Sequence, residues 1–419
     1  MFILTEYMKN YIHRNIYYIF IFFLLLIFFI LEFRTLKIAF NTSITSPVDF
    51  PQEYIGGKQL LSGKSLYNWD YKIVFKEFKI PQDSNKINAH PPFAAILLLP
   101  LSLLSYQHAI FVWSLLTIFF MFVTTFFLLK AENISLKYFP LMILFVFGWW
   151  PFKDNLALGQ IDILLLLFVV LAYFFLNKNE ILSGVFIALA TMLKFYPGLL
   201  ILYFLVTKKY KAFMSAVVVI FIIFLVTLII THNDWFILFF KIIPKDVKNF
   251  QASPWVISIN GFLTRCFLFI KNKKIAFLFE NFLYYSSALI LMLMTFSIGK
   301  NKLRNNLGFS IFVILSLLLS PLTFEYSLNL LLLPSLILLK EFLNKKNLKG
   351  IILFMIASIC AYGMYYSILE RFYFITHRHF NSLPSTFIEA ISVYGMQTYG
   401  ILFLFFLNYK LLKEHIESN

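Results

Sequence analysis

The strongest constraint on the fold is a succession of long apolar runs separated by short basic clusters. The run at 19–33, IFIFFLLLIFFILEF, does not alternate between polar and apolar residues. Strands of a membrane barrel alternate in this way, so such runs favour helices. Because a spanning helix needs roughly 20 apolar residues, a chain of 419 residues has room for about twelve of them. The sequence therefore predicts an all-α integral membrane protein.

Composition agrees with this interpretation. Hydrophobic residues make up 60% of the chain and charged residues 13%, against about 45–50% and about 25% in soluble domains. These values exclude an ordinary cytosolic enzyme, a disordered protein and a nucleic-acid-binding domain. The formal charge of +16 does not imply a nucleic-acid partner, because the basic residues lie between apolar runs, as in cytoplasmic loops of membrane proteins.

The apolar runs give approximate helix positions. Residues 90–104, HPPFAAILLLPLSLL, are too short and too rich in proline to span, and we expect a half-helix at the membrane interface. Two short segments meet around LKFYP, which indicates irregular backbone lining a cavity. The predicted spanning or buried helices are 16–36, 106–129, 138–152, 160–176, 181–193, 197–206, 212–231, 275–297, 307–322, 327–339, 350–369 and 388–409.

The distribution of basic residues predicts the topology. Clusters such as Lys208, Lys209 and Lys211 mark cytoplasmic loops and place both termini in the cytoplasm. The first apolar run is long and bulky, so we expect an uncleaved helix and no signal peptide. Residues 1–419 then form one polytopic domain in a bacterial cytoplasmic membrane, with extracytoplasmic loops at 37–105, which contains interfacial helices, and at 232–274.

Acidic residues are scarce, and two of them follow the first helix. Asp49 and Glu53 lie in SPVDFPQEY. A carboxylate near a membrane-embedded cavity can act as a general base, since loss of hydration makes it a better proton acceptor. The alternative is that Asp49 caps a helix that starts at Pro51. The residues alone leave both interpretations open.

Ionisable residues at the edges of apolar helices are the next candidates. Asp162 begins such a helix, where an ionisable group suggests function. Lys194 follows GVFIALATML and would bind an anion such as a lipid phosphate, or extend to the headgroups. Arg265, in NGFLTR, is a second phosphate candidate because its fork matches phosphate oxygens. Glu325, in SPLTFEYS, faces either the same cavity or bulk water.

The sequence predicts no metal and no cofactor. HRH at 377–379 has no carboxylate at metal-ligand spacing nearby, so we interpret it as loop histidines. Cys266 and Cys360 form no CxxC pair. A phosphate-binding GxxxxGK[ST] loop does not occur, so ATP-driven work is not indicated.

An ordered set of segments resembles glycosyltransferase family 87, polytopic GT-C enzymes that use polyprenyl-phosphate sugars. The most specific are a GQ followed by an apolar helix, and an apolar helix followed by lysine, an aromatic residue and proline. The segments are VDFPQEYIGGKQLLSGKSLY (48–67), HPPFAAILLLPLSLL (90–104), NLALGQIDILLLL (155–167), LSGVFIALATMLKFYPGLLIL (182–202), SINGFLTR (258–265) and LSPLTFEYSLNLLLLP (319–334).

The resemblance implies a GT-C-like bundle that transfers a hexose, typically mannose, from a polyprenyl-phosphate donor to an extracytoplasmic glycolipid or glycan, with inversion. The acidic residue of the first outer loop, expected to be the catalytic base, corresponds to Asp49. The lysine corresponds to Lys194, and the asparagine and arginine of the SxxN…R segment to Asn260 and Arg265.

Further polar residues are expected to contact the sugar or the acceptor. One departure concerns the late SP motif, after which many members carry a tryptophan and paired histidines, whereas this chain has Phe324, Glu325 and Tyr326. The resemblance therefore does not define the sugar or acceptor. The predicted sugar and acceptor contacts are Glu53, Tyr54, His90, Gln160, Asp162, Asn260 and Glu325.

Two other functions share this general architecture. A transporter or lipid flippase often shows inverted repeats and charges deep within several helices, whereas most acidic residues here lie in loops. A polysaccharide polymerase usually places its large outer loop late in the chain, whereas the main loop here follows the first helix. Both remain alternatives to the glycosyltransferase.

Overall fold

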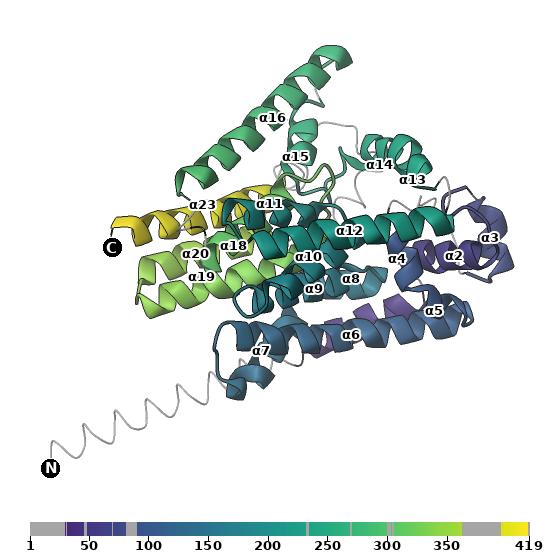
Figure 1. Cartoon of the computed structure of the whole chain (residues 1–419), viewed down its shortest axis with the longest axis horizontal. Coiled ribbons are helices and arrows are strands. Elements are labelled where there is room, and N and C mark those ends of the chain that lie inside the picture. The colour runs from purple at the N-terminus through teal and green to yellow at the C-terminus, as the bar shows by residue number, and fades with distance from the viewer. Residues whose placement is uncertain are drawn as a thin grey trace.

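The computed structural model describes residues 30, 32–45, 48–68, 70–80, 90–231, 234–268, 270–299, 303, 306–362 and 395–417. Most of the long helices run roughly parallel to the long axis of the molecule (Figure 1). Within the described ranges the regular elements are helical, apart from an isolated antiparallel bridge between Val256 and Phe324. The predicted all-α class is confirmed to this extent.

The helices have the following bounds. They are α2 (Phe50–Leu61), α3 (Tyr71–Glu77), α4 (Pro92–Leu97), α5 (Leu99–Ser102), α6 (Tyr106–Ala131), η1 (Leu136–Tyr138), α7 (Phe139–Gly148), α8 (Trp150–Leu158), α9 (Asp162–Phe175), α10 (Glu180–Leu193), η2 (Tyr196–Gly198), α11 (Leu199–Val206), α12 (Tyr210–Thr231), α13 (Asp234–Ile237), η3 (Leu238–Ile242), α14 (Ile243–Phe250), α15 (Ile259–Cys266), α16 (Lys273–Ser297), α18 (Asn306–Leu318), η4 (Glu325–Leu331), α19 (Leu332–Asn344), α20 (Leu348–Tyr362) and α23 (Met396–Glu417). Residues 32–45 form a further helix.

Some of the described helices are long and apolar enough to cross a membrane. By length and composition these are α6, α12, α16 and the continuous segment Glu325–Asn344. Shorter apolar helices accompany them, among them α9, α10 and α18. The chain is therefore a helical protein suited to a membrane.

Two predicted helices are interrupted at prolines. The predicted helix 138–152 is divided between α7 and α8 at Trp149, two residues before Pro151. Proline inside a continuous helix would lack the N–H that bonds four residues back and its ring would clash there, whereas the first turn of a new helix accommodates it. The predicted half-helix 90–104 forms the short helices α4 and α5.

Of the predicted helices 16–36, 350–369 and 388–409, residues 16–29, 31, 363–369 and 388–394 lie outside the described residues.

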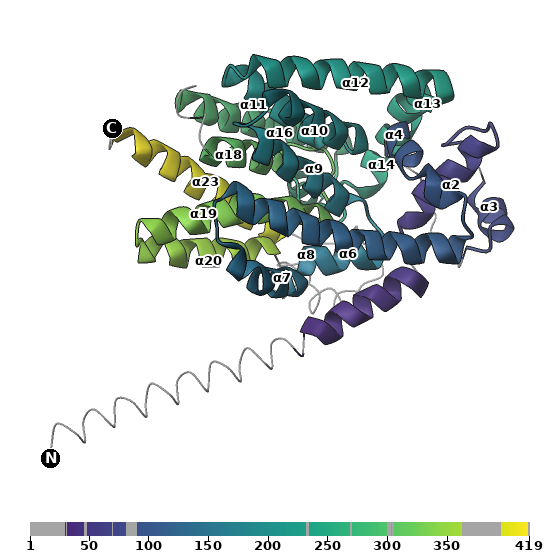
Figure 2. The same ribbon diagram turned by 60° about the horizontal axis from the view of Figure 1, so that its bottom comes forward.

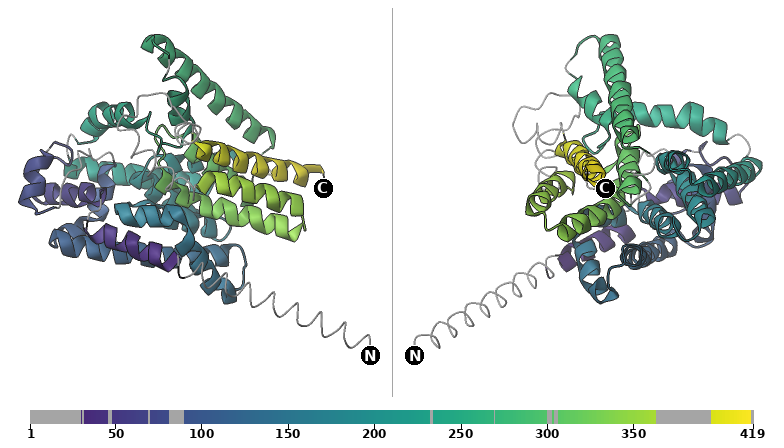
Figure 3. Two further views of the ribbon diagram at one scale, coloured as in Figure 1. Left: turned by 180° about the vertical axis from the view of Figure 1, so that it is seen from behind. Right: turned by 60° about the vertical axis from the view of Figure 1, so that its left-hand side comes forward.

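Burial separates two kinds of apolar helix. Every residue from Leu307 to Leu318 in α18 is buried, so this helix contacts protein on all sides. By contrast, α12 and α16 expose large side chains such as Phe221 and Phe282. A helix that is apolar all round needs an apolar environment, which other helices supply to α18 and lipid would supply to α12 and α16. Figure 3 shows α16 leaning away from the other helices.

Helices α2–α5, α13 and α14 of the two predicted outer loops lie toward one end of the molecule, opposite the C-terminus, whereas α15 lies nearer the middle, next to α16 (Figures 1 and 3). The stretch 232–274 is not a plain loop, because it contains α13, η3, α14 and α15. The carboxylate of Asp234 joins the two stretches, accepting hydrogen bonds from the N–H of Leu66 (2.8 Å) and the hydroxyl of Ser65.

The N-terminal helical segment packs beside α6 (Figure 2). The hydroxyls of Ser43 and Ser114 share a hydrogen bond of 2.8 Å across this contact. Glu32 forms an ion pair with Lys153 of α8, and both side chains are largely buried. These contacts fix the segment that leads to Asp49.

A glycine between α8 and α9 sets the position of the residues that follow. Gly159 has φ +71°, and a Cβ atom there would lie 2.7 Å from the Cβ of Phe50. Its carbonyl accepts a hydrogen bond from the indole of Trp113 (3.1 Å). Only glycine combines this backbone conformation with so close an approach.

We predict that Gly159→Ala destabilises the protein more than Gly63→Ala. Both glycines have positive φ, but a Cβ at Gly63 would meet nothing within 4 Å. Left-handed backbone alone costs a non-glycine residue about 1–2 kcal/mol, and the contact with Phe50 adds to it. Thermal unfolding in detergent measures the difference. Equal midpoints for the two variants would contradict this explanation.

Candidate active site

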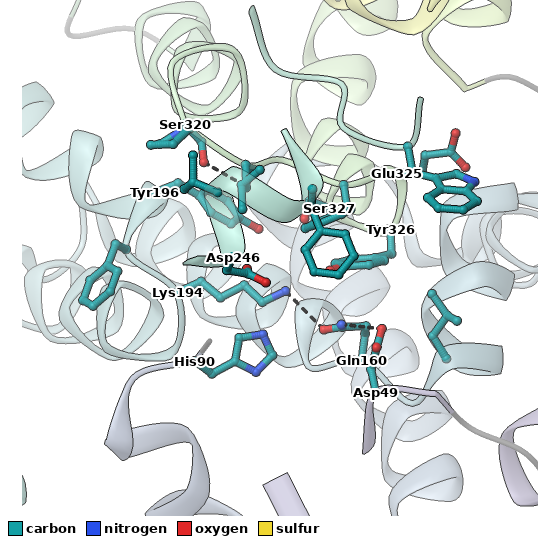
Figure 4. Close-up of a pocket in the computed structure, with 18 of the residues that line it drawn as sticks. Asp49, His90, Gln160, Lys194, Tyr196, Asp246, Ser320, Glu325, Tyr326 and Ser327 are labelled. Carbon is teal, nitrogen blue, oxygen red and sulfur yellow. Dashed lines mark hydrogen bonds between the residues drawn. The ribbon is translucent and has the colours of Figure 1, made fainter. Parts of the chain in front are cut away.

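A cavity of about 800 Å³ is lined by residues of α2, α8, η2, α11, α14, α18 and η4 and by the turns that precede α9 and follow α10. Figure 4 shows polar side chains converging on it from segments that are distant in sequence. Its lining includes five of the predicted site residues: Asp49, His90, Gln160, Lys194 and Glu325.

Asp49 is held at the cavity by the turn around Gly159. Its backbone N–H donates to the carbonyl of Leu158 (2.9 Å), and its Oδ2 accepts from Nε2 of Gln160 (2.7 Å). Asp49 precedes α2, all of whose residues the structure describes, and its side chain makes no capping hydrogen bond to that helix. The carboxylate, 3% exposed, is therefore directed to the cavity side and not to the helix end.

Lys194 enters the same cavity from the end of α10. The helix ends there, with Lys194 in an extended conformation, shortly before Pro197. The ammonium donates to Oδ2 of Asp162 (2.5 Å) and Oε1 of Gln160 (3.2 Å). It also lies 4.7 Å from the ring centroid of Tyr326, a cation–π contact. The side chain is thus bound inside the protein instead of extending to headgroups.

Asp162 lies behind Lys194 and compensates its charge. It is fully buried at the first residue of α9, where the positive end of the helix dipole stabilises a carboxylate. Besides Lys194, the hydroxyls of Tyr196 and Ser327 donate to its Oδ1 at 2.9 Å each. Asp162 is consequently a support for the cation, and the cavity lining does not include it.

Gln160 connects the carboxylate of Asp49 to the ammonium of Lys194 (Figure 4). Its amide nitrogen donates to Asp49 and its amide oxygen accepts from Lys194, so both partners fix the orientation of the amide. The structure therefore brings a proton acceptor and a cation to one cavity while one side chain keeps them apart.

His90, which lines the cavity, and Glu53 behind it form a second contact between ionisable side chains. Nδ1 of His90 contacts Oε1 of Glu53, which is buried. The hydroxyl of Tyr67 donates to the carbonyl of His90 (2.6 Å). Burial and the charges of Glu53 and Asp234 raise the pKa of Tyr67 well above its usual value, so this hydroxyl stays protonated and keeps donating.

Besides Glu53 and Asp162, three further predicted residues lie outside the described cavity lining. The hydroxyl of Tyr54 donates to the carbonyl of Leu104 (2.9 Å), and Nδ2 of Asn260 donates to that of Pro321 (3.2 Å). Nη1 of Arg265 donates to the carbonyls of residues 253 and 256, at 2.7 Å each. The role of Arg265 in phosphate binding stays a prediction.

Several residues that line the cavity were not predicted from the sequence. Asp246 belongs to α14, together with the cavity residues Ile243, Val247 and Phe250. Their three- and four-residue spacing is the signal that would have identified an amphipathic helix here. Other polar lining residues absent from the predicted site include Gln52, Asp154, Tyr196, Ser316, Ser320, Tyr326 and Ser327.

A second, apolar groove of about 420 Å³ adjoins the cavity. Phe195, the residue after Lys194, lines both. The groove lies among α10, α12, α13 and η3, and its other lining residues are Thr191, Met192, Val217, Ile220, Phe221, Phe224, Trp235 and Phe239. An apolar groove is thus continuous, at Phe195, with a cavity lined by polar and charged side chains.

Comparison with known proteins identifies relatives of the chain. The model of glycosyltransferase family 87 matches residues 88–321, more than half of the chain. This range contains His90, Gln160 and Lys194 but begins after Asp49, whose place at the cavity rests on the structure.

A Mycolicibacterium smegmatis protein is similar over a shorter stretch. This polyprenol-phosphate-mannose-dependent α-(1-2)-phosphatidylinositol pentamannoside mannosyltransferase is 28% identical over 162 residues. The match covers 38% of this chain and 38% of the relative.

We predict that Asp162→Asn destabilises the protein by about 3–5 kcal/mol, because it leaves the ammonium of Lys194 without a buried counter-charge. Replacing both residues, Asp162→Asn with Lys194→Met, should cost less than the sum of the single changes. Thermal unfolding of the detergent-solubilised variants completes this double-mutant cycle. Additive effects would show that the two charges do not depend on each other.

Proposed function

This chain belongs to glycosyltransferase family 87, and we propose that it transfers a hexose from a polyprenyl-phosphate donor to an extracytoplasmic glycolipid or glycan. The observation that supports this most is the cavity in which Asp49 and Lys194 are joined through Gln160. A proton acceptor and a cation at this separation suit an acceptor hydroxyl on one side and a leaving phosphate on the other.

The same proposal includes the arrangement in the membrane. We place the chain in a bacterial cytoplasmic membrane as a GT-C-like bundle of about twelve spanning helices. Each has about 20 residues, or fewer where a proline interrupts the helix. Both termini are then cytoplasmic, and the cavity faces outward. The grouping of α2–α5 with α13 and α14 at the end opposite the C-terminus supports this orientation.

The apolar groove supports a lipid-linked donor. A donor phosphate at Lys194 would place the start of its isoprenoid chain beside Phe195, where the groove begins. The sugar we propose is mannose, because the Mycolicibacterium smegmatis relative is named for its dependence on polyprenol-phosphate-mannose. Neither a nucleotide nor ATP is needed, since the sugar is already activated by its link to phosphate.

The proposed reaction is a single in-line displacement. Asp49 accepts the proton of an acceptor hydroxyl as its oxygen bonds to the anomeric carbon. The bond between that carbon and the phosphate oxygen breaks, and the electron pair leaves with the polyprenyl phosphate. Lys194 stabilises the charge that develops there, as a fixed cation does in a dry site. Attack opposite the leaving group inverts the anomeric carbon.

The acceptor is proposed to be rich in hydroxyl groups. Asp154, Asp246 and Glu325 line the cavity, and carboxylates accept hydrogen bonds from sugar hydroxyls. They come from α8, α14 and η4, so they surround a bound molecule. The printed name of the relative gives a phosphatidylinositol pentamannoside as its acceptor, which fits a glycolipid here.

We predict that Asp49→Asn lowers the transfer rate at least about 100-fold, because the amide cannot take the proton. The assay supplies polyprenyl-phosphate mannose and glycolipid acceptors to the purified protein in liposomes and detects products by mass spectrometry. Glu280→Gln is the matched control, since it neutralises another buried carboxyl group, one that lies outside the cavity lining. Normal turnover by Asp49→Asn would exclude Asp49 as the base. Movement of labelled lipid without covalent change would instead indicate a flippase.

We predict that Lys194→Met raises the KM for the donor about tenfold and leaves the KM for the acceptor unchanged, because only the donor carries the phosphate at this position. Tenfold corresponds to about 1.4 kcal/mol of binding free energy. Lys153→Met is a matched control, since it removes another buried ion pair, that with Glu32, which lies outside the cavity. An unchanged donor KM would assign Lys194 a purely structural role.

A further inference from the structure

We propose that His90, positioned by Glu53, donates a hydrogen bond to the leaving phosphate and is the second positive group of the site. This inference rests on the proposed function. It assigns the histidine to the donor phosphate, whereas the sequence predicts a contact with sugar or acceptor.

A second positively charged group is needed because of the negative charge on the donor phosphate. A phosphodiester bears one negative charge and gains a second when the bond to the sugar breaks. Lys194 is the only lysine or arginine among the described residues lining the cavity. Its ammonium already contacts Asp162 at 2.5 Å. One ammonium that is compensated in this way leaves much of the developing charge without a counter-charge.

His90 is the cavity residue that can supply the missing donor. His90 and Lys194 both line the cavity, and Figure 4 shows the side chains of both directed into it. Nδ1 contacts Oε1 of Glu53, so the ring reaches a ligand through Nε2. A carboxylate at Nδ1 orients the imidazole and stabilises its positive form, in which Nε2 carries a proton.

The support of His90 repeats that of Lys194. In each case the cationic group lines the cavity, and a carboxylate that does not line it lies behind. Asp162 is fully buried, and Glu53 is 2% exposed. The backbone of His90 is also fixed by the hydroxyl of Tyr67 (2.6 Å). The ring is therefore preorganised, which is what a group that stabilises developing charge requires.

The displacement of the polyprenyl phosphate requires no proton transfer to the phosphate. The proton of the acceptor hydroxyl goes to Asp49, and the electron pair of the broken bond stays on the phosphate oxygen. Nε2–H of His90 donates to that dianion and keeps its proton. Glu53 touches neither sugar nor phosphate in this scheme, so it is a positioning residue.

Binding measurements test the inference independently of turnover. The probes are undecaprenyl phosphate, which is close to a dianion, and its mannosyl phosphodiester, a monoanion, each titrated against the full chain in nanodiscs. His90→Phe should weaken binding of the phosphate about tenfold, the size of one charge-assisted hydrogen bond. Binding of the phosphodiester should weaken only about twofold. Glu53→Gln, which keeps the shape and removes the charge, should shift the same preference in the same direction.

His108→Phe is the matched control, because His108 contacts Ser105 away from the cavity lining. Unchanged or equally reduced binding of the two lipids in both His90→Phe and Glu53→Gln would overturn the inference. If these variants instead preferred the dianion more strongly than the wild-type protein does, Nε2 would be a hydrogen-bond acceptor, and the inference would be overturned as well. Failure of the proposed function would differ, because the wild-type protein would then transfer no sugar.

Discussion

The buried contact between Lys194 and Asp162 is the interaction on which the cavity depends. An ammonium on a long side chain near a membrane surface otherwise extends to water or headgroups. Here a fully buried carboxylate at the start of α9 keeps it at the end of α10. Such a pair offsets its own desolvation poorly, so stability alone does not explain it. Its effect is to hold one positive charge at a defined place in the cavity wall.

The side chain of Gln160 explains how an acid and a cation can share this cavity. A direct ion pair between Asp49 and Lys194 would bind each charge to the other and compete with substrate. The amide instead accepts from one and donates to the other. The left-handed Gly159 places Gln160 there, since its turn also anchors Asp49 through the carbonyl of Leu158. The backbone turn at Gly159 thus sets the separation between Asp49 and Lys194, on which the proposed chemistry depends.

The sequence predicts most of the described helices, because long apolar runs such as 106–129 and 212–231 can be recognised without knowledge of their tertiary contacts. It also indicates Asp49, as a scarce carboxylate shortly after the first apolar run, and Lys194, at the end of an apolar run before a proline. Gln160 is indicated by the resemblance of the GQ segment. The analysis of apolar runs does not indicate α14, because IPKDVKNF is short and has the polarity of a loop, and its only signal is the three- and four-residue spacing of its apolar residues. The direction of a side chain such as that of Arg265 is likewise set by carbonyls that only the tertiary fold brings near.

The position of the apolar groove bears on how two lipid-linked substrates would meet. The groove joins the cavity at Phe195, on the Lys194 side, whereas Asp49 lies across Gln160. A donor whose chain occupies the groove brings its phosphate to Lys194 first and points its sugar toward Gln160. In the proposed reaction, an acceptor hydroxyl would then approach from the Asp49 side, opposite the leaving phosphate. Separate approaches would also keep the acceptor from displacing the donor, so the order of binding need not be fixed.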